Sequence, residues 1–371
     1  MANNKEQTKG NFRIKGIITG LGNQNAYREG TTKKGDEYKT IKFGVKTSPI
    51  NKIDVELFAM KPDFIYPYSS KDKKALKIPY KHKDIFKEEG YFEKHRNIFK
   101  DTKVFSKKSQ LFNPKKDHID SYHVVGISLS DEKGRESFID YEAPEKILEM
   151  FKDGDIVFIS GELKPNTFVN KQGIEVYGVK ANIGSIKKES DIDFESKDFQ
   201  EISAFEQDVI ITDTYREENK TILNCYTIGY GDKIDKLQLS VHDDKTPKMA
   251  KKFEKLKFGD YMKFQGLFRN EAEQIIIEEE SEEDEFGSIA PAGFNNNAST
   301  KYNSELVITA VAKNDDGTSC YQKQKYTRED FVEDEIEEYD DISLDDLDEE
   351  APNGINEGED EEIEDEDDLP F

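Results

Sequence analysis

The sequence is poor in the residues and patterns that mark secreted, membrane-bound and catalytic proteins. Its 371 residues include only two cysteines, Cys225 and Cys320, which allow one disulfide but no disulfide framework. No window approaches about 18 consecutive apolar residues, and no apolar segment follows the first residues, so we expect neither a membrane helix nor a secretory signal. These absences favour a cytoplasmic protein.

Enzyme motifs are also missing. The chain has no GxxxxGK(S/T) phosphate loop and no HExxH, GxSxG or CxxC motif. His118 and His123 have no cysteine partners, so their spacing is only a weak indication of a metal site. We therefore predict that the protein is not an enzyme and uses no cofactor or metal. A cryptic nuclease is the least favoured hypothesis.

The net charge of −25 is distributed unevenly. Residues 1–190 contain 36 basic and 27 acidic side chains, residues 191–328 contain 18 and 28, and residues 329–371 contain 24 acids without a Lys or Arg. This asymmetry indicates a front that binds a polyanion and a tail that binds proteins, although solubility alone is the alternative explanation. The tail has too few apolar residues for a core, so we expect it to be disordered.

The first half of the chain alternates as β-strands do. The pattern predicts strands over 11–20, 38–47, 52–60, 156–163 and 174–186, a turn around 170–173 and a helix over 143–155. Within 38–47, Ile41, Phe43 and Val45 would face the core, and Tyr38, Lys42 and Lys46 would face outward. Three strands, a helix and two strands is the order of the OB-fold, a five-stranded Greek-key barrel.

The same order recurs in the second half. Strands are predicted over 206–215, 221–230, 236–243, 261–268 and 304–313, and a helix over 247–260; residues 274–288 either extend a strand ladder or belong to an acidic loop. Residues 152–155 match residues 257–260, and Gly161 and Gly266 follow at the same distance. We therefore predict two tandem OB-folds, at 1–190 and 191–328, before the tail at 329–371. One OB-fold and a different second domain is the alternative.

A long insertion, roughly residues 61–120, interrupts the first domain. We predict that it consists of helix and loop, and it combines positive charge with aromatic rings. Residues 61–117 contain 16 basic and 8 acidic side chains and ten Phe or Tyr residues. Single-stranded nucleic acid needs this combination, because cations follow its phosphates and ring faces take its unstacked bases. Four phenylalanines, Phe86, Phe92, Phe99 and Phe105, are expected to form a small core of the insertion instead.

We predict that the strand-binding residues lie on the first barrel and its insertion. Arg13, Lys15, Tyr38, Lys42 and Lys46 share the outward parity of two strands, where OB-folds bind oligonucleotides. A tyrosine ring can lie at the surface with its hydroxyl group in water, so the insertion's tyrosines are the best candidates for stacking on bases. The complete predicted set is Arg13, Lys15, Tyr38, Lys42, Lys46, Tyr66, Tyr68, Tyr80, Lys81, Tyr91 and Phe168.

The last five residues, Asp367-Asp368-Leu369-Pro370-Phe371, resemble the C-terminal tip of bacterial single-stranded DNA-binding proteins, which usually reads Asp-Asp-Asp-Ile-Pro-Phe. The resemblance implies an OB-fold and a tip that recruits replication, recombination and repair proteins. It also implies that Phe371 anchors the partner and Pro370 stiffens the tip, with Leu369 in place of Ile. Asp365, Asp367 and Asp368 would guide the tip onto basic residues.

The chain also departs from that family. It has no tryptophan, its tail is acidic rather than Gly- or Gln-rich, and it is about twice as long. It therefore resembles a divergent phage or mobile-element member, which would act in the cytoplasm of a bacterial host. Three questions remain open on sequence alone: whether the tail also masks the basic front, whether the second domain adds a groove or a contact between copies, and whether the strand is DNA or RNA. The alternative function is an acidic adaptor or DNA mimic that binds a nucleic-acid enzyme but no DNA.

Overall fold

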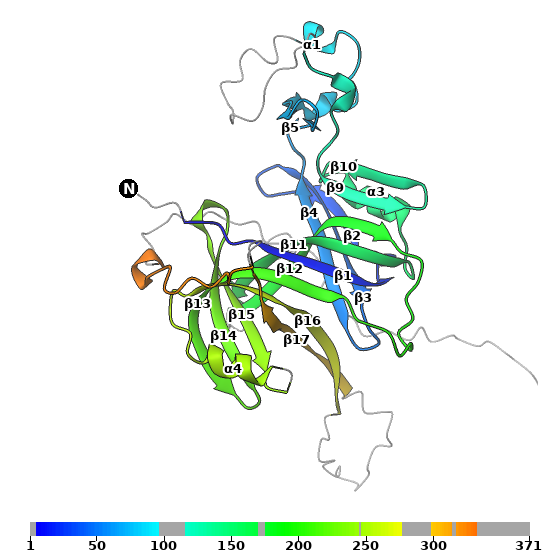
Figure 1. Ribbon diagram of the computed structural model, residues 1–371. Helices are drawn as coiled ribbons and strands as arrows, with labels where there is room; N and C mark the ends of the chain where they lie inside the picture. The colour runs from blue at the N-terminus through cyan, green and yellow to red at the C-terminus, as the bar shows by residue number, and fades with distance from the viewer. Residues whose placement is uncertain are drawn as a thin grey trace, which may run out of the picture. The chain divides into compact units, whose positions relative to one another are not determined.

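The computed structural model describes residues 5–95, 116–169, 175–244, 246–276, 298–313 and 317–331. Met1–Phe331 form one compact unit, and Val332–Phe371 form a second that lies outside the described residues. The first unit is mostly β-structure, as the sequence predicts (Figure 1). In the part of the chain that the structure describes, no helix combines the length and apolarity needed to cross a membrane.

Five strands of the first half close into a ring. The strands are β1 (Gly10–Thr19), β3 (Glu37–Lys46), β4 (Lys52–Met60), β11 (Ile156–Val169) and β12 (Glu175–Lys188). β1 pairs antiparallel with β3 and β11, β3 with β4, and β11 with β12. A parallel pair between β12 and β4 closes the ring. A short strand, β2 (Tyr27–Thr31), pairs with β3, and helix α3 (Ala143–Met150) precedes β11.

The second half repeats this pairing order. Its strands are β13 (Ser203–Glu217), β14 (Lys220–Ile228), β15 (Ile234–His242), β16 (Tyr261–Ile276) and β17 (Ala298–Val311). β13 pairs antiparallel with β14 and β16, β14 with β15, and β16 with β17, and a parallel contact between β15 and β17 closes this ring. Helix α4 (Pro247–Phe253) again precedes the fourth strand. Both α3 and α4 are shorter than the predicted helices, because a tight junction follows each.

The two junctions are equivalent in their hydrogen bonds. The Lys152 N–H donates to the Asp155 carboxylate at 3.0 Å, and the Lys257 N–H donates to Asp260 at 3.0 Å. The glycine between each pair has a positive φ, +88° at Gly154 and +86° at Gly259, which only glycine adopts without strain. The match that the sequence suggests between residues 152–155 and 257–260 is therefore a match of local structure.

Gly161 and Gly266 are also equivalent. Each lies at a register shift in the long strand that follows its junction, between Ser160 and Gly161 in β11 and between Gln265 and Gly266 in β16. A Cβ at Gly161 would lie 1.9 Å from the Asn182 carbonyl oxygen, and one at Gly266 would lie 2.2 Å from the carbonyl oxygen of Val307. Both positions need glycine because the neighbouring backbone passes so close.

One hydrophobic core joins the two rings. β1 pairs antiparallel with β13 from Gly10↔Gln207 to Ile14↔Ser203, and the buried residues of both rings belong to one continuous cluster. The Phe268 ring of the second ring lies 6.3 Å from Phe12 of the first, centroid to centroid. The predicted boundary at residues 190 and 191 falls in the segment that connects the rings, but it does not divide the core.

The insertion differs from the predicted mixture of helix and loop. Its described part contains four two-residue strands that pair as β5 (Phe64–Ile65) with β8 (Ile78–Pro79) and β6 (Tyr68–Ser69) with β7 (Lys74–Ala75), and a short α-helix, α1 (Tyr91–Lys94). Residues Leu76, Ile78, Phe86, Tyr91 and Tyr122 form its core with Ala59, Ile139 and Tyr141 of the adjoining chain. A hairpin that the sequence analysis missed, β9 (Ile127–Asp131) with β10 (Gly134–Phe138), follows it and pairs in parallel with β12.

Candidate nucleic-acid interface

An aromatic pair lies on the outer side of β3 and β4, opposite the core. The rings of Tyr38 and Phe58 stack with centroids 5.6 Å apart and planes inclined by 26°. Gly30 of β2 pairs with Tyr38, and a Cβ there would lie 3.0 Å from the Tyr38 hydroxyl oxygen. The absence of a side chain at Gly30 thus lets the Tyr38 ring lie flat over the strand. Both rings are only partly buried.

Lysines lie farther along the same side of the two strands. Lys42 and Lys46 of β3 and Lys52 of β4 share the outer side, whereas Ile41, Phe43 and Val45 are buried, which confirms the predicted register of β3. We call Tyr38, Lys42, Lys46, Lys52 and Phe58 the outer face.

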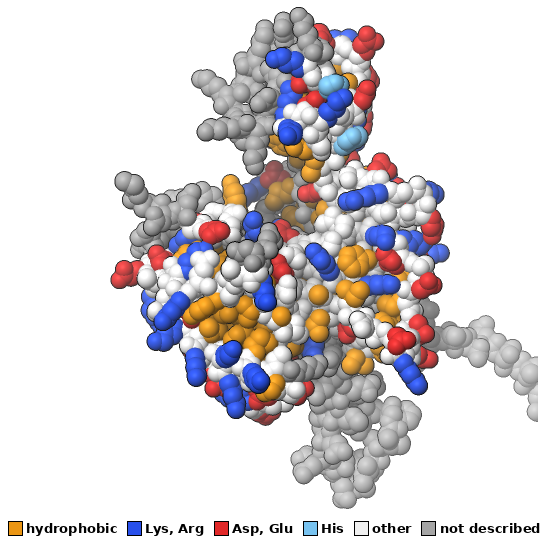
Figure 2. All heavy atoms as spheres, viewed as in Figure 1, with side chains coloured by type: hydrophobic (Ala, Val, Ile, Leu, Met, Phe, Trp, Pro, Cys, Tyr) orange, Lys and Arg blue, Asp and Glu red, His pale blue; other side chains and the backbone are white. Residues whose placement is uncertain are grey.

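The lysines of the outer face are only loosely paired. The Nζ atoms of Lys42 and Lys52 lie 3.8 and 3.9 Å from the Asp54 carboxylate. Such exposed pairs are weak, so these ammonium groups can turn to a phosphate at little cost. In Figure 2, basic and hydrophobic side chains are interleaved on the face of the molecule that is in view.

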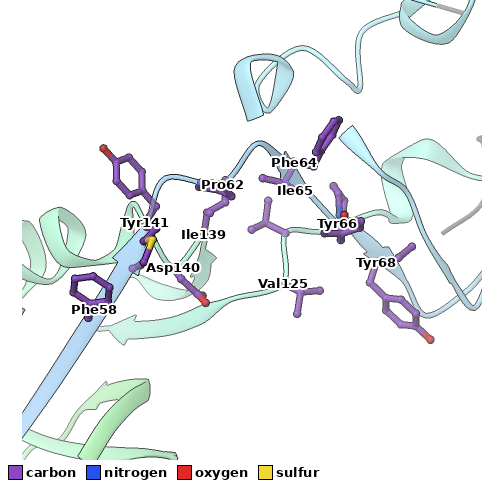
Figure 3. Close-up of a pocket in the computed structure, with 15 residues that line it drawn as sticks. Phe58, Pro62, Phe64, Ile65, Tyr66, Tyr68, Val125, Ile139, Asp140 and Tyr141 are labelled. Atoms are coloured by element: carbon purple, nitrogen blue, oxygen red, sulfur yellow. The ribbon is translucent and has the colours of Figure 1, made fainter. Parts of the chain in front are cut away.

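A pocket continues from the outer face along the end of β4. It has a volume of about 630 Å³ and lies between β4, the first residues of the insertion and the segment before α3. Tyr66 and Tyr68 line it with 47% and 41% of their surface exposed. Figure 3 shows Phe58 and Tyr68 toward its two ends, with Ile139 and Asp140 between them. The pocket therefore extends the aromatic surface that begins at Tyr38.

Asp140 is the acidic residue that lines this pocket. Its side chain is exposed to solvent, yet neighbouring protein atoms partly desolvate the carboxyl and raise its pKa above the ordinary value, while the positive charge of Lys164 acts in the opposite direction. Among the described residues, none donates a hydrogen bond to this carboxylate or forms an ion pair with it. Asp140 is therefore an acceptor that can receive hydrogen bonds from a ligand.

Tyr91 does not offer a free ring face, in contrast to the prediction that it stacks on bases. Tyr91 is 3% exposed, and its hydroxyl lies 3.0 Å from Nδ1 of His82. Tyr80 is half-buried and donates a hydrogen bond to Glu142 at 3.0 Å. The rings of Tyr80 and Tyr91 pack in the small core of the insertion, as does Phe86. Lys81, which follows Tyr80 in the sequence, is exposed.

The connecting segment covers part of β1. Arg13 is exposed as predicted, but the Lys15 N–H donates to the Ile202 carbonyl at 2.9 Å. Lys15 also lines a pocket of about 290 Å³ with Asp191, Asp193 and Asp198. Acids of the connecting segment therefore lie beside a lysine that we predicted to bind phosphate, a contact that alternation within a strand cannot reveal.

Other predicted residues are described only in part or not at all. Phe168 lies in β11, but only its backbone is described, and Phe99 and Phe105 lie outside the described residues. The tip residues Asp365, Asp367, Asp368, Leu369, Pro370 and Phe371 also lie outside them.

The weak metal indication finds no support among the described residues, where no group of three or more His, Cys, Asp and Glu side chains could hold an ion. His118 instead faces Asp72, with Nδ1 and Oδ1 3.1 Å apart.

Sequence reasoning missed Phe58, Met60 and Asp140. The alternation of residues 52–60 contains a signal for the first two, because it places Phe58 and Met60 on the same side as Asp54. No comparable signal exists for Asp140, which follows a hairpin that the sequence analysis did not predict.

Comparisons with solved structures find single-stranded DNA-binding proteins at low similarity. The wild-type protein from Thermus aquaticus matches with a TM-score of 0.36 and 8% identity, over 83% of this chain and 93% of that chain. A deletion mutant of the same protein matches with a TM-score of 0.36 and 8% identity, over 82% and 94%. Similarity at this level carries no argument about function.

Sequence comparisons give a different kind of result. No curated protein matches the chain. The model of one protein family, described as YorF, matches residues 9–346, which include both rings and the insertion. The chain therefore belongs to the YorF family.

Proposed function

We propose that this protein binds single-stranded DNA through the outer face and the adjoining pocket, without catalysing a reaction. We further propose that each five-stranded ring is an OB-fold. The closed pairing order, the single parallel pair in each ring and the helix before the fourth strand support this assignment. OB-folds bind oligonucleotides on the face of their second and third strands, which correspond here to β3 and β4.

The stacked pair of Tyr38 and Phe58 carries the proposal. Aromatic rings on the outside of a sheet serve a single strand, whose unstacked bases have free faces, and they offer nothing to a duplex, whose bases are stacked on one another. Lys42, Lys46 and Lys52, farther along the same side of β3 and β4, supply the charge that a phosphate backbone needs. Binding should therefore tolerate many sequences and weaken as salt rises.

Recruitment of other proteins is the second part of the proposal. The motif at 367–371 would bind replication, recombination or repair proteins, with Phe371 in an apolar pocket and the carboxylates on basic residues. The sequence motif alone supports this part. An acidic adaptor or DNA mimic is the alternative, and the 24 acids at 329–371 favour it. The two functions differ in whether the protein binds a nucleic acid at all.

Fluorescence anisotropy with labelled dT oligomers tests the proposal directly. The oligomer should bind, a duplex of the same length should bind much more weakly, and affinity for the oligomer should fall steeply between low and physiological salt. An RNA oligomer of the same length, used as a competitor, decides between DNA and RNA. Failure to bind any single strand at low salt would favour the adaptor, and an affinity independent of salt would exclude the outer face as the binding surface.

A further inference from the structure

We propose that the pocket beside Phe58 receives one guanine base of the bound strand and that Asp140 recognises it. This inference rests on the proposed binding of single-stranded DNA and adds a base preference to it. The Asp140 carboxylate would accept hydrogen bonds from the N1–H and the 2-amino group of guanine. The aromatic and aliphatic walls of the pocket would hold the faces of the base.

The position of the pocket supports an occupant that belongs to the strand. Phe58 stacks on Tyr38 and also lines the pocket, so the outer face and the pocket form one surface. A strand that stacks on Tyr38 therefore reaches the pocket mouth with its neighbouring bases. The volume of about 630 Å³ is ample for one base and falls within the range of about 300–1,000 Å³ that is usual for ligand pockets.

The pocket walls are suited to the faces of a base. Met60, Tyr66, Tyr68 and Val125 line the pocket and are between 41% and 67% exposed, so a ligand can reach their side chains. Ring stacking accepts any base, because every base has a π-face. The walls alone would therefore bind all four bases, and any preference must come from a polar group.

Asp140 is such a group, and its chemistry selects one base. An ionised carboxylate accepts hydrogen bonds but donates none. On its Watson–Crick edge, guanine presents two adjacent donors, whereas adenine and cytosine present a donor beside an acceptor, and thymine presents one donor between two acceptors. Only guanine can therefore form a paired, charge-assisted interaction with Asp140. This edge is free only in a single strand, which agrees with the proposed function.

The test uses dT oligomers that carry a single central dG, dC, dA or dT, with affinities measured by anisotropy. We expect the dG oligomer to bind about tenfold more tightly than the all-dT oligomer, as two charge-assisted hydrogen bonds predict. Replacing the dG by deoxyinosine, which lacks the 2-amino group, should remove part of this preference. Asp140→Asn introduces an amide that both donates and accepts, so it should abolish the dG preference.

Glu136→Gln is the matched control, because Glu136 is an exposed acid on β10 that does not line the pocket. It should keep the dG preference. If no oligomer binds, the proposed function fails; if all four oligomers bind equally, or if Asp140→Asn keeps the preference, only the guanine assignment is overturned. Tight binding of free dGMP, at the affinity of the dG oligomer, would overturn the strand-borne base in favour of a nucleotide site.

Discussion

At the scale of single residues, tyrosines of this chain have opposite roles because their neighbours differ. Tyr38 lies over Gly30 and stacks on Phe58 with part of its ring in solvent. Tyr91 packs in the core of the insertion and is 3% exposed. The same side chain is therefore a binding candidate at one position and a packing residue at the other.

Tyr38→Ala should weaken binding of dT oligomers by about 1–3 kcal/mol, because one stacking platform is lost. The slope of log affinity against log salt should not change, since no phosphate contact is removed. Lys42→Ala should instead remove a phosphate contact, so it should weaken binding and flatten that slope by up to about one unit. Tyr230→Ala is the control, because Tyr230 is 93% exposed at the turn between β14 and β15. A loss at Tyr230 equal to that at Tyr38 would move the stacking site to the second ring.

Tyr91→Ala should lower stability rather than reduce stacking on bases. Removing a buried aromatic side chain costs about 3–5 kcal/mol, and here the loss falls on a small core. Faster limited proteolysis of the insertion would be the direct sign of this loss. An unchanged cleavage rate, together with weaker binding of dT oligomers, would contradict the packing role and restore Tyr91 to the predicted binding set.

At the scale of elements, a glycine lies at the register shift of each of two long strand pairs, β11–β12 and β16–β17. In each, a neighbouring carbonyl occupies the place of a Cβ, so the strand bends where the side chain is missing.

The insertion contains a group whose charge depends on pH. The ring of His82 lies 4.7 Å from that of His95, and burial, followed by the charges of His95 and Lys81, lowers the pKa of His82.

Gly161→Ala should destabilise the first ring by about 1–3 kcal/mol, because the new methyl group overlaps the Asn182 carbonyl oxygen. Gly229→Ala is the matched control, since the nearest atom to its Cβ lies at 3.6 Å and its φ is −88°. Urea unfolding followed by circular dichroism measures both changes. Equal stability of the two variants would mean that the backbone at Gly161 relaxes without cost.

The insertion should become less stable in acid because of His82. Its pKa in the folded chain lies below the ordinary 6.5, so the unfolded chain binds the proton more readily. The contribution of His82 is complete above about pH 6.5 and is lost as the pH falls through the lower folded pKa. Limited proteolysis should therefore cut the insertion faster at about pH 5.5 than at neutral pH, and His82→Gln, which cannot titrate, should reduce this difference. A difference of the same size in both proteins would assign the effect to other groups.

At the scale of the whole molecule, the described unit ends at a packed residue. Phe331 lies in the last short helix (Arg328–Phe331), and its ring centroid is 5.1 Å from that of Tyr226. A deletion that tests the tail should therefore begin at Val332 and not at Glu329, where the sequence analysis places the boundary. Residues 332–371 still contain 22 acids and no Lys or Arg.

Deleting residues 332–371 should tighten binding of dT oligomers, most clearly at low salt, if the tail competes for the basic surface. Deleting Phe371 alone leaves the acids in place, so affinity for DNA should stay the same while capture of replication or repair proteins is lost. Unchanged affinity of the long deletion at low salt would exclude masking. Partners that still bind after Phe371 is deleted would exclude the tip as the anchor.

The sequence by itself determined the mostly β architecture, the register of β3 and the repeated junction. These features are local: alternation fixes which side of a strand Ile41 and Lys42 face, and a Gly-Asp junction recurs with the same hydrogen bonds. Only the tertiary structure decided that Tyr38 stacks on Phe58, that Tyr91 is buried and that Asp140 lines the pocket with Tyr66. These residues lie far apart in the chain, and they meet only because the sheet closes and the insertion folds against its edge.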